Sequence, residues 1–210
     1  MIHKDLFAPP GPLVNSLQFA DSVKAKPIQI NGTGCPDNIR FVPSPNCDDR
    51  PAGCTINLLV IHSISLPPDE FGGEGVIELF TNRLDPRADP YYQAIRDLRV
   101  SAHFFIRRDG EAIQFVSCEK RAWHAGESCW RSKARCNDFS IGVELEGSDT
   151  TPFTDIQYAT LVALTRVLQA AYPITDIAGH SDIAPGRKTD PGPSFDWERY
   201  RAALLAACRT

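Results

Sequence analysis

Apolar residues occur along the chain from residue 56 onward in short runs that are separated by loops rich in proline and glycine. The run at 56–62 is continuous and rich in β-branched residues, which predicts a strand buried on both faces. Two further runs, 103–107 and 112–116, flank Asp109-Gly110 and predict a β-hairpin. At 141–146 apolar and acidic residues alternate, so this segment is predicted to be a strand with Glu144 and Glu146 on one face.

Helical spacing dominates the second half of the sequence. Thr154 and Gln157 fit a capping box, and the apolar residues that follow recur at helical spacing until Pro173 ends the predicted helix. We also predict a short helix at 74–82, a strand at 174–178 and a closing helix at 196–207. The residues expected to point inward from that last helix are Trp197, Leu204 and Leu205.

These elements predict an α/β fold of mixed α+β type, with a central mixed β-sheet flanked by helices. Residues 1–54 carry many prolines and no periodicity, so we expect an irregular N-terminal arm that packs on the core. Disorder of roughly the first 28 residues is an open alternative. We expect residues 55–210 to form the functional domain.

Composition narrows the possible partners and location. The formal net charge is −4, which excludes a binder that holds nucleic acid by bulk positive charge. No stretch approaches the roughly 18 apolar residues of a membrane helix, and the first residues lack a secretory pattern. The seven cysteines form no disulfide-framework or zinc-ribbon spacing. We therefore expect a cytoplasmic protein with reduced thiols and no membrane or nucleic-acid partner.

Three residues suggest a metal site. His62 ends a predicted strand, His180 follows another, and Asp190 lies in the proline-rich and glycine-rich turn at 188–193. Two imidazoles and a carboxylate supply three of the four ligands of a catalytic zinc site. From spacing alone, hydrogen-bonded structural histidines remain an alternative.

Several motifs together resemble the zinc-dependent amidases that act on 1,6-anhydro-N-acetylmuramyl-L-alanine, within the N-acetylmuramoyl-L-alanine amidase and peptidoglycan-recognition superfamily. The resemblance runs in order from about residue 43 to 205 and rests on the segments 60–62, 98–103, 121–126, 136–147, 179–180 and 187–197. It implies a zinc-binding groove on one side of the sheet. It also implies hydrolysis of the amide between the lactyl group of anhydro-muramic acid and L-alanine during peptidoglycan recycling.

The resemblance also assigns roles to residues. It implies that one zinc ion (Zn²⁺) per chain is held by His62, His180 and Asp190. It implies that Glu144 and Lys188 are catalytic. Glu146 competes with Glu144, because alternation along a strand sends both side chains to the same face.

The remaining candidates concern the substrate and the surroundings of the metal. The substrate peptide of this family carries carboxylates, so Arg99 and Arg135 are candidates to bind it, and Trp123 either stacks on the sugar or packs. The family often has asparagine where this chain has Ser63, which puts one substrate contact in doubt. His103 and His124 either orient a metal ligand or simply pack, and we leave both off the metal. Three N-terminal cysteines allow an accessory metal site, although structural thiols fit their spacing better: Cys35, Cys47 and Cys54.

Two rival functions stay open at this point. One is a recognition module of the same fold that binds peptidoglycan fragments without cutting, which predicts missing zinc ligands. The other is a lytic amidase acting on intact cell wall, which predicts a signal peptide or a wall-binding domain. We expect instead a monomeric enzyme with a small soluble anhydro-muropeptide substrate.

Overall fold

One mixed sheet organises residues 39–206, the part of the chain that the computed structural model describes. In chain order the strands are β1 (Arg40–Phe41), β2 (Cys47–Asp49), β3 (Leu58–Ile64), β4 (Phe104–Ile106), β5 (Ala112–Gln114), β6 (Lys120–Ala122), β7 (Cys129–Trp130), β8 (Lys133–Ala134), β9 (Ser140–Glu146) and β10 (Asp176–Gly179). The helices are α1 (Gly75–Phe80), α2 (Pro90–Ile95), the 3₁₀ helix η1 (Cys136–Asp138), α3 (Asp155–Ala171), α4 (His180–Ile183) and α5 (Trp197–Ala206).

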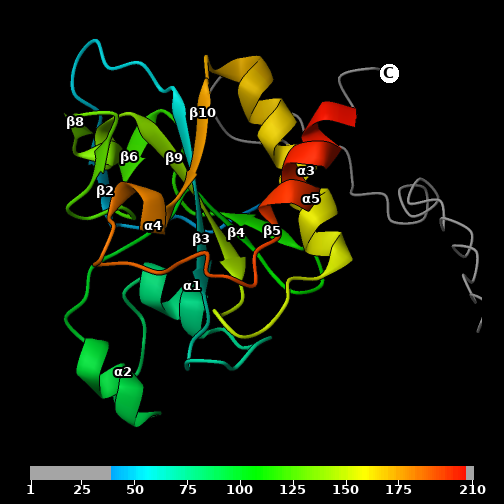
Figure 1. Ribbon diagram of the computed structural model, residues 1–210. Helices are drawn as coiled ribbons and strands as arrows, with labels where there is room; N and C mark the ends of the chain where they lie inside the picture. Colours follow the sequence, from blue (N-terminus) through cyan, green and yellow to red (C-terminus); the bar gives the residue numbers. More distant parts are fainter. Residues whose placement is uncertain (1–38, 207–210) are drawn as a thin grey trace, which may run out of the picture.

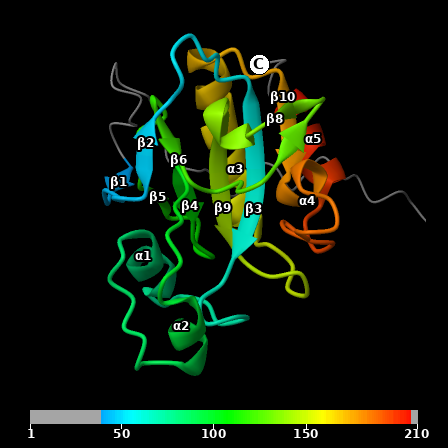
Figure 2. The same ribbon diagram turned by 90° about the vertical axis from the view of Figure 1, so that its left-hand side faces the viewer.

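The central sheet has the strand order β1-β5-β4-β9-β3-β10. Strands β4, β9, β3 and β10 run parallel to one another, whereas β5 pairs with β4 as an antiparallel hairpin. Helices α3 and α5 cover one face of this sheet, and β6, β7, β8 and α4 lie toward the other face (Figure 1, Figure 2). The arrangement confirms the predicted mixed α/β fold, with strands β3 and β9 buried at its centre.

Alternation along β3 and β9 decides what each face of the sheet carries. Leu59 and Ile61 of β3 pack in the same apolar cluster as Leu161 and Leu164 of α3. The intervening positions of β3, which include His62, therefore point away from α3. One face of the sheet thus forms the main core, and the other carries a smaller apolar cluster around Leu58 and Val60 together with the side chain of His62.

Helices α3 and α5 test the sequence predictions in detail. The capping box at Thr154 is present, with Gln157 N–H donating to Thr154 Oγ1 and Gln157 Oε1 accepting from Thr154 N–H. The prediction that Leu205 points inward is wrong, because this side chain is 69% exposed. Tyr200 is the buried residue of α5, since it shares a helix face with Leu204, four residues on.

The described part of the N-terminal arm, residues 39–54, packs on the core and contributes two short strands. Strand β1 extends the central sheet beside β5, and β2 pairs with β6. The thiols of Cys47 and Cys54 donate to the backbone carbonyls of Ser44 and Asp138. The expectations for residues 1–38, including Cys35, lie outside the described residues. No helix within 39–206 has the length and apolar character needed to cross a membrane.

Candidate metal centre and active site

The register of three parallel strands brings the predicted site residues together. His62 of β3 is directly opposite Glu144 of β9. On the other side of β3, Gly179 of β10 is opposite Ile61, so that His180, the next residue along, lies beside His62. Asp190 follows in the loop after α4. The site therefore forms where these strands end, at an edge where parallel sheets commonly place functional groups.

Three donor atoms converge at this edge. His62 Nδ1 and His180 Nδ1 are 3.0 Å apart, and each lies 3.0 Å from Asp190 Oδ2. Zinc with bonds of about 2.0–2.1 Å holds tetrahedral ligands roughly 3.3 Å apart, so the separations suit this ion. Nitrogen and carboxylate oxygen are also ligands that zinc commonly takes. The donor set therefore fits the predicted metal, and within residues 39–206 it is the group of side chains that meets the geometry of a metal site.

The far nitrogen of each imidazole has its own partner. His180 Nε2 lies 3.1 Å from the carbonyl oxygen of Ala125, so this nitrogen carries the proton and Nδ1 keeps its lone pair. His62 Nε2 lies 2.9 Å from Nδ1 of His124. The structure thus places His124 beside a proposed ligand, and not merely within the core.

Burial and charge set the protonation of the cluster. Burial lowers the pKa of His62 to about 4, against the opposing effect of its hydrogen bond with Asp190. Burial alone would raise the pKa of Asp190, but hydrogen bonds with His180 and His62 outweigh it, so that pKa lies below its usual value. A neutral His62 imidazole and an ionised Asp190 carboxylate are the protonation states in which these two groups bind a cation.

Glu144 and Glu146 differ sharply in their surroundings, although both lie on β9. Burial, followed by the charge of Asp190, raises the pKa of Glu144 well above its usual value. Its Oε1 lies 4.0 Å from His62 Nδ1, and its buried Oε2 has no hydrogen-bond partner within the described structure. The carboxylate of Glu146 instead accepts the backbone N–H groups of Gly72 and Arg108. Of the two carboxyl groups, Glu144 is therefore the one that lies beside the three donor atoms with an oxygen that has no partner in the described structure.

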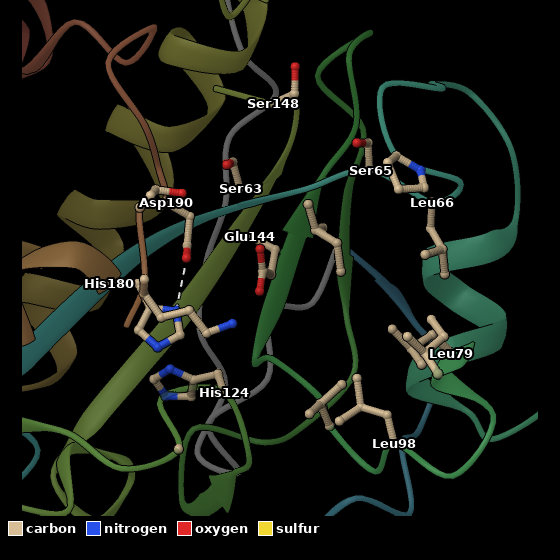
Figure 3. Close-up of a pocket in the computed structure, with 18 of the residues that line it drawn as sticks. Ser63, Ser65, Leu66, Leu79, Leu98, His124, Glu144, Ser148, His180 and Asp190 are labelled. Atoms are coloured by element: carbon tan, nitrogen blue, oxygen red, sulfur yellow. Dashed lines mark hydrogen bonds and ion pairs between the residues drawn. The ribbon is translucent and has the colours of Figure 1, made fainter. Parts of the chain in front are cut away.

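A groove of about 790 Å³ opens over these residues. Figure 3 shows Glu144 and Asp190 pointing into it, with Leu66, Leu79 and Leu98 on the opposite wall. Lys188 lies on the rim, and its exposed ammonium makes no hydrogen bond within the described residues. One wall of the groove is thus apolar and the other is polar and charged.

The three predicted substrate-binding residues are not all placed at the groove. Arg99 and Trp123 line it, together with Ser63. Arg135 is not among the lining residues, and its Nε donates to Asp138 at 3.0 Å. Its position follows from a left-handed backbone conformation at the start of η1, which periodicity does not reveal.

Arg187 also lines the groove, although it was not among the site residues predicted from the sequence. Its guanidinium donates to the carbonyls of Ala125 and Glu127 at 2.7 and 2.6 Å. The available signal was its position directly before Lys188, within a segment that already carried the resemblance. An exposed arginine has no pattern of its own, so the signal was weak.

Comparison with known proteins decides the family. The model of the N-acetylmuramoyl-L-alanine amidase family matches residues 52–193. This span includes the predicted metal ligands and catalytic residues, which are His62, Glu144, His180, Lys188 and Asp190. The chain belongs to the N-acetylmuramoyl-L-alanine amidase family. Membership confirms the resemblance predicted from the sequence motifs and identifies the fold as an amidase fold.

Relatives of this amidase are similar over most of their length. The 1,6-anhydro-N-acetylmuramyl-L-alanine amidase AmpD of Enterobacter cloacae is 59% identical over 170 residues, which cover 80% of this chain and 91% of the relative. AmpD of Escherichia coli is 58% identical over 167 residues, covering 79% and 91%. The crystal structure of a selenomethionine derivative of AmpD matches with a TM-score of 0.81 and 55% identity, covering 83% of this chain and 98% of that one.

Proposed function

We propose that this amidase hydrolyses the amide between the lactyl group of 1,6-anhydro-N-acetylmuramic acid and L-alanine in soluble muropeptides, with zinc bound by His62, His180 and Asp190. The observation that carries the proposal is the convergence of three donor atoms 3.0 Å apart beside the buried, unpartnered oxygen of Glu144. The substrate is inferred from relatives of 52–59% identity that carry this activity in their names. We extend the proposal to a monomer that recycles peptidoglycan fragments in the cytoplasm.

The donor set determines how the metal would be held. His62 and His180 present Nδ1 lone pairs, and Asp190 presents an ionised oxygen. When bound in such a site, zinc activates a water molecule and polarises the scissile carbonyl. A carboxylate ligand, unlike a thiolate, leaves more positive charge on the ion.

Glu144 has the surroundings of a group that both accepts and donates a proton. Burial raises the pKa of this carboxyl group well above its usual value, which favours the protonated form more than in an exposed glutamate. We propose that it takes a proton from the attacking water and delivers it to the departing amine of L-alanine. Such proton transfer typically contributes about 10²- to 10⁴-fold in rate.

Lys188 supplies the positive charge that the tetrahedral intermediate needs. Its ammonium is close enough for its charge to lower the pKa values of both Glu144 and His62. We propose that it stabilises the developing oxyanion, a contribution typically worth about 2.7–4 kcal/mol for one donor.

The walls of the groove offer contacts for the rest of the substrate. Arg99 carries a guanidinium that suits the carboxylates of a stem peptide. Trp123 presents an aromatic ring to a sugar. Because Arg135 does not line the groove, the proposed substrate contacts rest on Arg99 and Trp123.

Mass spectrometry of the products tests this function. Zinc-loaded protein is incubated with anhydro-muropeptide in one arm and with insoluble sacculi in the other, with metal-free protein as the control. We expect free peptide and anhydro-muramic sugar from the soluble substrate, only when zinc is present. Cleavage of sacculi alone would favour a lytic amidase, and zinc binding without cleavage of either substrate would favour a recognition module.

A further inference from the structure

Two consecutive residues contact the far nitrogens of both proposed histidine ligands. His124 Nδ1 lies 2.9 Å from His62 Nε2, and the carbonyl oxygen of the next residue, Ala125, lies 3.1 Å from His180 Nε2. His62 lies in β3 and His180 is the first residue of α4, and the two histidines are 118 residues apart in sequence. A single short segment therefore fixes the orientation of both imidazole rings.

The hydrogen bonds of His124 have one consistent proton assignment when a cation occupies the site. His62 must then keep its Nδ1 lone pair for the metal, so its proton is on Nε2 and is donated to His124 Nδ1. The proton of His124 is consequently on its own Nε2, which lies 3.2 Å from the hydroxyl oxygen of Ser140. His124 thus accepts from the ligand on one side and donates to the sheet on the other.

The segment is itself held rigidly. The side-chain oxygen of Asn137 accepts the backbone N–H groups of both His124 and Ala125, at 3.2 and 2.8 Å. The guanidinium of Arg187 donates to the same carbonyl of Ala125 that faces His180. The His124 ring lies over Gly142, where a Cβ atom would be only 2.5 Å from the ring. Backbone, side chain and packing therefore all fix this segment.

We infer that residues 124–125 form a positioning element for the metal site, with His124 acting through His62 and the Ala125 carbonyl acting through His180. The inference rests on the proposed zinc site and assigns to His124 a role that the family match does not. Orienting partners of this kind raise the basicity of the ligand and lock its tautomer, and their loss typically weakens metal binding about 10- to 100-fold. The effect of His124 should therefore appear in metal affinity before any substrate is added.

Two substitutions of one residue separate positioning from packing. His124→Leu replaces the ring with an apolar side chain of similar bulk and removes the acceptor, whereas His124→Asn places an acceptor oxygen near the position of Nδ1. Zinc affinity is measured by competition with a chromogenic chelator, and thermal unfolding of the metal-free proteins shows whether each variant folds. We expect about 10- to 100-fold weaker zinc binding for His124→Leu and substantial recovery for His124→Asn. Equal zinc affinity of folded His124→Leu and the unsubstituted protein would overturn the inference.

A second measurement needs no variant. Nitrogen-15 NMR of the zinc-loaded protein reports which imidazole nitrogen carries a proton, and we expect His124 to be protonated on Nε2 and unprotonated on Nδ1. A proton on His124 Nδ1 would overturn the inference even if His124→Leu failed to fold. Failure of the unsubstituted protein to bind zinc would overturn the proposed function as well, whereas zinc binding that ignores His124 would overturn the positioning role alone.

Discussion

Gly142 offers the sharpest structural test of how the site is supported. A Cβ atom at this position would lie 2.5–2.7 Å from three atoms of the His124 ring. The ring would have to move by about 0.9 Å to reach ordinary van der Waals contact. Half of that shift, directed away from His62, is enough to lengthen the 2.9 Å hydrogen bond between the two histidines beyond about 3.2 Å. Gly142→Ala should therefore disturb the metal site without altering any proposed ligand.

The expected size of the effect follows from overpacking a buried site. Inserting a methyl group into a well-packed region typically costs about 1–3 kcal/mol. In a chain of this size each kcal/mol lowers the melting temperature by roughly 2–4 °C. We expect Gly142→Ala to show this loss of stability in thermal unfolding of the metal-free protein. Zinc affinity, measured by chelator competition, should fall about tenfold or more, because the orienting partner of His62 is displaced.

Gly73→Ala is a matched control, because its added Cβ would have no atom closer than 4.0 Å. We expect this control to leave both melting temperature and zinc affinity near those of the unsubstituted protein. If Gly142→Ala behaved like Gly73→Ala in both assays, the packing of His124 against the sheet would not support the metal site as described.

Three further predictions address the other buried polar groups. Glu144→Gln should lower kcat by about 10²- to 10⁴-fold with zinc affinity retained. Glu146→Gln should keep most turnover but cost about 1–3 kcal/mol of stability, because one of the two backbone N–H groups that the carboxylate accepts loses its partner. Burial lowers the pKa of His103 to about 3. Between about pH 6.5 and pH 3 this histidine therefore binds a proton in the unfolded chain but not in the folded protein. The free energy of unfolding should fall as the pH falls through that window, by up to about 1.4 kcal/mol per pH unit for this residue. Chemical denaturation at pH 5 and 7 should show a shallower dependence for His103→Gln. Arg50 donates to four backbone carbonyls, and Arg50→Met should cost about 3 kcal/mol or more in the same denaturation assay.

Each of these has a contrary result. The assignment of the catalytic carboxylate is wrong if Glu146→Gln abolishes turnover with zinc retained while Glu144→Gln stays active. If the stability of His103→Gln depended on pH as that of the unsubstituted protein does, the pKa of this histidine would be the same in the folded and unfolded protein. A melting temperature of Arg50→Met within a degree of the unsubstituted protein would show that water replaces its hydrogen bonds at little cost.

Periodicity predicted the parts of the fold that depend on long or regular patterns. The hairpin around Asp109-Gly110 and the capped helix α3 formed as expected, because turn chemistry and capping act locally. Strands β1 and β2 were not predicted, since each has only two or three residues and forms by pairing with a distant partner. Short strands of this kind depend on tertiary context.

The site shows the same division between local and distant information. The alternation of residues along the strand predicted that Glu144 and Glu146 lie on one face, but it could not distinguish their roles. What separates them is the approach of Gly72 and Arg108 to Glu146, from loops far away in the sequence. The role of His124 was likewise open, because its neighbours are brought to it by the register of β3 and β9.

The position of the bound metal tests the central claim most directly. Anomalous diffraction at the zinc absorption edge, from crystals of the zinc-loaded protein, locates the ion without any assumption about activity. We predict one peak about 2.0–2.2 Å from each of the three donor atoms, which belong to His62, His180 and Asp190. A zinc peak bound by other residues, or no peak in protein that has been loaded with zinc, would contradict the account.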